Sequence, residues 1–143
     1  MIFADTSALH AAFDSAQPEH SGAAEILADE TLAISPLIVT ELDHLVHRDL
    51  GFPATMQVRE ALNSRMADGQ CRLADLKPAG LRAAHAVRHT YAGLRLDLAD
   101  AVGVVLADRC RTDRIFTPDQ RDFRAITPLT PGLTAVRILP VGG

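Results

Sequence analysis

The sequence predicts a single α/β domain over residues 1–143, with a short, mostly parallel central sheet flanked by helices. Short apolar runs alternate with amphipathic helical stretches, which is typical of a parallel sheet covered on both faces. The composition agrees, because aromatic residues make up only 4% and tryptophan is absent, which favours helices over an all-β sandwich. A chain of 143 residues fits one hydrophobic core and has no room for a second.

The expected strands are five short apolar or alternating runs, and helices are expected between them. The strands are predicted at residues 2–4, 32–34, 71–76, 114–117 and 136–139. Ser35 followed by Pro36 predicts a helix start, an N-cap with proline at the first helical position, and Gly51 ends that helix. The other helices are expected after Asp5 with Thr6 or Ser7 as N-cap, around 23–27, from Pro53 to Gly69, from Pro78 to Gly93, and over 98–107.

Composition and charge exclude several classes of protein. No apolar run is long enough to cross a membrane, and the N-terminus has no basic segment typical of a secretory signal. Cys71 and Cys110 fit no disulfide or zinc spacing, so they are interpreted as small core residues of a reduced, cytoplasmic protein. The net charge of −4 argues against binding nucleic acid through bulk charge, although five arginines cluster late in the chain.

Four carboxylates stand out because of where they fall. Asp5 and Asp119 follow predicted strands, and ligands of parallel sheets bind beyond the carboxyl ends of the strands. Glu41 and Asp100 interrupt apolar helical stretches, where acids are rarely found unless they are paired or bound to a metal. Converging carboxylates repel one another, and Mg²⁺ or Mn²⁺ relieves that repulsion. The pattern indicates a metal-dependent site for a phosphate substrate.

Each carboxylate also has a structural interpretation that the residues alone leave open. Asp5 suits a helix cap, and Asp100 suits a first helical turn with Asp97 as N-cap. Asp119 suits a turn, and Glu41 suits a side chain that reaches solvent.

The residues that carry these acids resemble the four motifs of PIN domain nucleases. Ile2-Phe3-Ala4-Asp5-Thr6-Ser7 is similar to the first motif, and Ser35-Pro36-Leu37-Ile38-Val39-Thr40-Glu41 to the second. Leu98-Ala99-Asp100-Ala101-Val102 is similar to the third, and Thr117-Pro118-Asp119 with Phe123 to the fourth. Their order, spacing and total length resemble the VapC-type toxins of bacterial toxin–antitoxin pairs, over nearly the whole chain.

The resemblance implies a PIN-like fold and an endoribonuclease that depends on Mg²⁺ or Mn²⁺ and cleaves structured RNA, tRNA or rRNA, to arrest translation. It implies a VapB-type antitoxin as partner, and a homodimer is expected. Asp5, Glu41, Asp100 and Asp119 become the catalytic and metal-binding acids, with Asp5 and Asp100 as the direct ligands. Ser7, Thr117, Asp97 and Asp122 are expected as supporting residues.

Other features are weighed against this interpretation. The arginines Arg109, Arg111, Arg114, Arg121 and Arg124 are candidates for RNA backbone contact, or form a solvated surface with local acids. His85 and His89, four residues apart, lack a third zinc ligand nearby. The apolar helix pair over 37–62 suits either a homodimer face or the monomer core. The alternatives in function are a catalytically silent PIN-fold binding module and, less well matched, a Mg²⁺-dependent phosphoacceptor or phosphatase domain.

Overall fold

The structure is a computed structural model that describes residues 1–112, 114–116 and 137–139. Helices and strands alternate along most of this part of the chain. Their bounds, in chain order, are β1 (Ile2–Ala4), α1 (Thr6–Phe13), α2 (His20–Asp29), β2 (Leu32–Ile34), α3 (Pro36–Leu50), α4 (Phe52–Ala67), β3 (Cys71–Leu73), α5 (Pro78–Thr90), the short 3-10 helix η1 (Ala92–Leu94), α6 (Leu98–Arg109), β4 (Arg114–Phe116) and β5 (Arg137–Leu139).

The described strands form one sheet in the order β3-β2-β1-β4-β5, and every neighbouring pair is parallel. Strand β1 lies in the centre, with Phe3 opposite Ala33 of β2 and Ile115 of β4. The predicted α/β class with a short parallel sheet is confirmed. Because the strands run in one direction, their carboxyl ends share one edge of the sheet.

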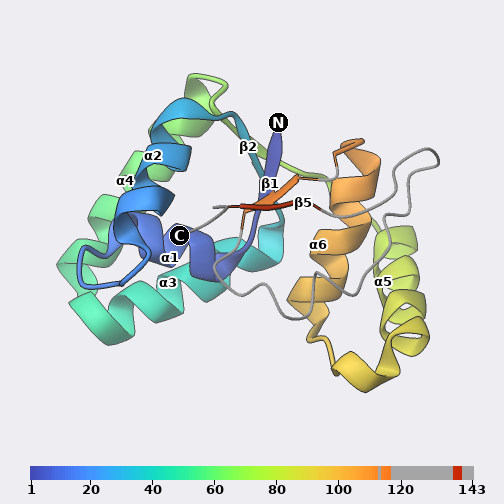
Figure 1. The fold of residues 1–143 in the computed structure, drawn as a ribbon. Helices are drawn as coiled ribbons and strands as arrows, with labels where there is room; N and C mark the ends of the chain where they lie inside the picture. Colours follow the sequence, from blue (N-terminus) through green and yellow to red (C-terminus); the bar gives the residue numbers. More distant parts are fainter. Residues whose placement is uncertain (113, 117–136, 140–143) are drawn as a thin grey trace.

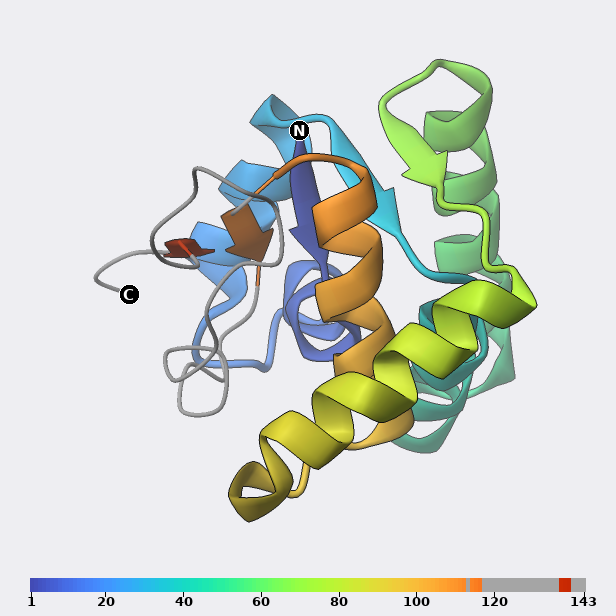
Figure 2. The ribbon, with the colours of Figure 1, turned by 90° about the vertical axis from the view of Figure 1, so that its right-hand side faces the viewer.

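Helices cover the sheet on both sides (Figures 1 and 2). Helices α1 to α4 lie on one side, where α1 packs on α2 and α3, and α3 packs on α4. Helices α5 and α6 pair with each other on the other side, and α6 lies against β1. Gly103 of α6 faces Phe3 of β1, and a Cβ at that position would lie 3.4 Å from a ring carbon of Phe3.

Most predicted elements are present, and the differences lie at their ends. Helix α3 begins after Ser35, whose hydroxyl accepts a hydrogen bond from the Leu37 amide at 3.0 Å, as predicted. The prediction of Thr6 or Ser7 as N-cap of α1 is wrong, because Asp5 caps that helix. Helix α4 begins at Phe52, one residue earlier than predicted. Helix α5 ends at Thr90 instead of Gly93, because the chain tightens there into η1.

The core lies between the sheet and its helices. The apolar residues of α3 and α4, among them Leu42 and Leu62 at 0% exposure, belong to this monomer core. The sequence left open whether the apolar helix pair over 37–62 forms a homodimer face or the monomer core, and these buried residues support the core. Cys71 is buried as predicted, whereas Cys110 is only half-buried, and both thiols are free. Among the described helices, none has the length and apolar character needed to cross a membrane.

Candidate active site

A pocket of about 390 Å³ opens where three helices begin near the carboxyl ends of the strands. Helix α1 begins directly after β1, and α3 begins directly after β2. The N-terminus of α6 reaches the same place from the other side of the sheet. The pocket is lined by Asp5, Thr6, Ser7, Ile38, Glu41, His44, Leu45, Asp97, Ala99 and Asp100. The fold therefore gathers acids from three separate parts of the sequence.

Asp5 is fixed by the first turn of α1. Its Oδ1 accepts hydrogen bonds from the Ala8 amide at 2.9 Å and from the Ser7 hydroxyl at 3.1 Å. The capping role considered for Asp5 is thus confirmed. Both of these hydrogen bonds use the same carboxylate oxygen. The first turn of α1 orients the side chain at the pocket wall.

Glu41 lies on α3, half-buried in the pocket wall. Burial raises the pKa of Glu41 above its usual value, and the negative charge of Asp97 raises it further. A hydrogen bond with the side chain of Thr6 acts in the opposite direction and lowers this pKa. Burial and the neighbouring negative charge thus both disfavour the ionised form of Glu41.

Asp97 and Asp100 belong to the first turn of α6. The Asp97 side chain is the N-cap and accepts a hydrogen bond from the Asp100 amide at 2.8 Å. Arg88 of α5 holds the preceding segment, donating to the Leu96 carbonyl at 3.0 Å. A helix N-terminus favours nearby anions, so the start of α6 stabilises two carboxylates side by side.

The charge on Glu41 is expected to cost stability when no cation is bound. Because its folded-state pKa is raised, the stability it contributes is present below the usual value near 4.5 and is lost as pH rises through the folded-state pKa. Glu41→Gln should therefore raise the free energy of unfolding at neutral pH, by on the order of 0.5 kcal/mol after solvent screening. Urea unfolding in the presence of a chelator should show that the stability gained by E41Q becomes smaller as the pH falls. Glu60→Gln, exposed on α4, is the control for removing a charge, and an unchanged or less stable E41Q protein at neutral pH would contradict the argument.

The structure brings together three of the four predicted catalytic acids: Asp5, Glu41 and Asp100 line the pocket. The predicted supporting residues Ser7 and Asp97 line it as well. Several other predicted site residues lie outside the described part of the chain: Asp119, Thr117, Asp122, Arg121 and Arg124.

The described arginines lie away from this pocket. Arg109 ends α6, nine residues beyond Asp100, or about 13 Å along the helix axis. Arg114 is the first residue of β4, so it lies at the amino ends of the strands, away from the pocket. It pairs with Glu30 at 3.0 Å. Arg111 lies between them, exposed, in the connection from α6 to β4. RNA contact by these residues stays a prediction.

Sequence reasoning missed His44 as a pocket residue. It lies one helical turn after Glu41 on α3 and lines the same pocket. The spacing of three residues was the available signal, since residues that far apart share one face of a helix.

The donor set of the pocket fits a hydrated hard cation. Its acids offer carboxylate oxygens, the ligands that Mg²⁺ prefers, and Mg²⁺ usually keeps several waters and takes only one or two carboxylates. The spacing agrees with this mode of binding: among the described residues, no three acids of the pocket bring their oxygens within 4.8 Å of one another. Asp5 and Asp100 would supply those carboxylates, and water would complete the coordination of such an ion.

Comparison with known proteins identifies the family. The family model described as "PIN domain" matches residues 2–127. The chain belongs to the PIN domain family. Ribonuclease VapC26 of Mycobacterium tuberculosis is 40% identical over 130 residues, covering 90% of this chain and 93% of the relative. The chain is accordingly a PIN nuclease of the VapC type, and nucleases of this family use a divalent metal ion.

Solved structures show the same PIN fold. VapC20 of Mycobacterium tuberculosis, described as a "Sarcin-Ricin loop cleaving toxin", superposes with a TM-score of 0.72 at 18% identity, over 83% of this chain and 92% of that one. A "Toxin-antitoxin complex from Klebsiella pneumoniae" gives a TM-score of 0.60 at 21% identity, over 91% of this chain and 99% of that chain. At these identities the likeness concerns the fold alone.

Proposed function

We propose that this PIN domain protein is a Mg²⁺- or Mn²⁺-dependent endoribonuclease whose active site is the acidic pocket. The observation that carries the proposal is the meeting of Asp5, Glu41 and Asp100, which lie far apart in the sequence, in one pocket. Asp119 completes the proposed catalytic and metal-binding set, on the strength of its motif. Asp97 supports the site as cap of α6, and Ser7 by its hydrogen bond to Asp5.

The roles follow from position and charge. A bound dication would activate water and stabilise the charge that develops on the phosphodiester. Asp5 and Asp100 are the proposed direct ligands, since each is fixed at the start of a helix. Glu41 is the proposed proton acceptor for the attacking water, because its raised pKa brings it closer to the working pH. Thr117 and Asp122 stay proposed as supporting residues.

The proposed substrate is structured RNA, tRNA or rRNA, whose cleavage arrests translation, and the proposed partner is a VapB-type antitoxin. Support comes from the VapC26 relative, named a ribonuclease, and from the fold shared with a toxin–antitoxin complex. Arg109, Arg111, Arg114, Arg121 and Arg124 stay proposed as RNA backbone contacts. A homodimer is also proposed, supported by exposed apolar side chains where α3 meets α4: Leu50, Phe52 and Met56.

Incubation of the purified protein with total RNA tests the proposal. Discrete cleavage products are expected with Mg²⁺ or Mn²⁺, and none with chelator, because no cation would then stabilise the charge that develops on the phosphodiester. Restoring the ion should restore cleavage, and adding the antitoxin encoded beside the gene should stop it. Cleavage that persists in chelator would contradict metal dependence. Absence of cleavage on every RNA, together with tight binding of a protein partner, would instead indicate a binding module. Sedimentation of the free protein distinguishes dimer from monomer.

A further inference from the structure

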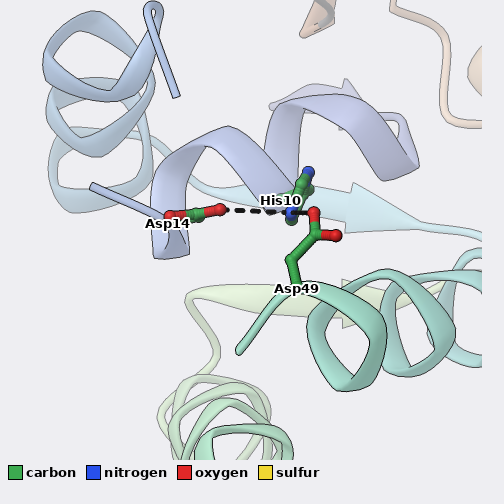
Figure 3. Close-up of side chains that lie close together, drawn as sticks. All are labelled: His10, Asp14 and Asp49. Carbon is green, nitrogen blue, oxygen red and sulfur yellow. Dashed lines mark ion pairs between the residues drawn. The ribbon is translucent and has the colours of Figure 1, made fainter. Parts of the chain in front are cut away.

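A cluster of one histidine and two carboxylates lies at the other end of α1, outside the acidic pocket (Figure 3). His10 lies on α1, Asp14 follows its last residue, and Asp49 is the penultimate residue of α3. Nε2 of His10 is 3.0 Å from Oδ2 of Asp49 and 3.5 Å from Oδ2 of Asp14. The three ligand atoms all lie within 4.8 Å of one another, and among the described residues no other group of three meets this condition.

The histidine nitrogen at the centre of this cluster is buried without a hydrogen-bond partner. The side chain of His10 is only 9% exposed and that of Asp14 only 6%. Asp49 Oδ2 is close enough to accept from Nε2, yet the geometry at Nε2 does not satisfy a hydrogen bond. A buried polar atom without a partner is costly and uncommon in native proteins. A ligand between the nitrogen and the oxygens would remove this cost.

Both carboxylates are already oriented by other groups. The Ala16 amide donates to Oδ1 of Asp14 at 3.0 Å, and the Gln17 side-chain amide donates to Oδ2 at 3.2 Å. Arg48 donates to both oxygens of Asp49, at 2.7 and 3.2 Å. Outer hydrogen bonds of this kind are typical of metal ligands.

We propose that His10, Asp14 and Asp49 form a second metal site, which binds a first-row transition-metal dication of the Zn²⁺ type. A tetrahedral Zn²⁺ ion with ligands at about 2.0–2.1 Å places neighbouring ligand atoms about 3.3–3.4 Å apart. The observed separations of 3.0 and 3.5 Å around Nε2 lie on either side of this value. One imidazole with two carboxylates suits Zn²⁺, whereas Mg²⁺ requires oxygen ligands.

The site would tie the end of α1 to the end of α3. These helices pack together, and both begin at the acidic pocket, so an ion at their far ends would fix their mutual position. Water has access for the fourth coordination position from the side of Asp49, whose side chain is 27% exposed. The role is structural, because the cluster shares no residue with the pocket lining. The inference is therefore independent of the proposed ribonuclease mechanism.

Calorimetric titration of the full-length protein with Zn²⁺, in saturating Mg²⁺ to occupy the acidic pocket, tests this site. We expect one Zn²⁺ per chain and a rise in the thermal unfolding temperature. Asp49→Asn should weaken Zn²⁺ binding at least about tenfold, because a charged ligand is lost. Asp49 lies near the protein surface, so the variant should keep its fold, which circular dichroism checks. Co²⁺ in place of Zn²⁺ should give tetrahedral ligand-field absorption that D49N lacks.

Two control variants locate the binding. His85→Gln with His89→Gln removes an exposed pair of rings on α5, 4.7 Å apart, and Asp100→Asn alters the acidic pocket. Both controls should bind Zn²⁺ as the unmodified protein does. Absence of Zn²⁺ binding, equal binding by D49N, displacement by Mg²⁺, or loss of binding in either control would overturn the proposal.

Discussion

RNA cleavage is expected to fall by at least about a thousandfold when Asp100 is replaced with alanine. Asp100 is a proposed direct ligand of the catalytic ion, and an ion that activates water and stabilises phosphodiester charge supplies several kcal/mol to the transition state. At 1.36 kcal/mol for each factor of ten, losing that contribution gives this decrease. The measurement is the initial rate of cleavage of a defined RNA at saturating Mg²⁺. Asp5→Ala should have an effect of similar size.

The loss should not come from unfolding. Asp97 caps α6 by accepting from the backbone amide of residue 100, a contact that alanine retains. Removing an acid from a first helical turn costs only about 0.3–1 kcal/mol. Asp108→Ala is the matched control, since Asp108 lies on the same helix about 12 Å farther from the pocket. Cleavage by D100A at the rate of the unmodified protein would remove the proposed mechanism.

The fold was predictable wherever the sequence marks its own boundaries. Ser35 and Pro36 start α3, because a hydroxyl suits the N-cap and the fixed φ of proline suits the first helical position. Gly51 ends this helix, because its φ of 91° is a backbone conformation that favours glycine. Where several residues serve equally well, the prediction fails. Asp5, Thr6 and Ser7 are all good N-caps, and only the geometry of the chain leaving β1 selects Asp5.

The acidic pocket was predictable for a different reason. Parallel strands end at one edge, so an acid directly after β1 and an acid in the helix that follows β2 come close together. Asp100 is marked by its apolar surroundings instead, where an acid is rarely found unless it is paired or bound to a metal. The second cluster follows no such rule, because Asp49 meets His10 only through the packing of α1 on α3. A signal was present, since His10 interrupts an apolar stretch as Glu41 and Asp100 do. A histidine in that position is also compatible with an ordinary core residue.

The largest expected loss of stability follows from Phe3→Ala. Phe3 is 1% exposed and lies on the central strand, between Ala33 and Ile115. Its ring fills the space beneath Gly103 of α6, a glycine that leaves no neighbouring side chain at that point to close the cavity. The free energy of unfolding should therefore fall by about 3–5 kcal/mol, the usual cost of Phe→Ala in a core that collapses poorly.

Urea unfolding of the two proteins in chelator measures this difference without a contribution from bound metal. Leu81→Ala on α5 removes a large apolar side chain where it is 42% exposed, so its effect should stay within about 0.5 kcal/mol. A large part of total stability, which is about 5–15 kcal/mol for such domains, thus depends on one side chain between β1 and α6. Since Asp5 and Asp100 belong to the segments joined by that contact, the folded fraction of F3A should lose cleavage activity as well. A loss below about 1 kcal/mol would show that α6 does not rest on Phe3.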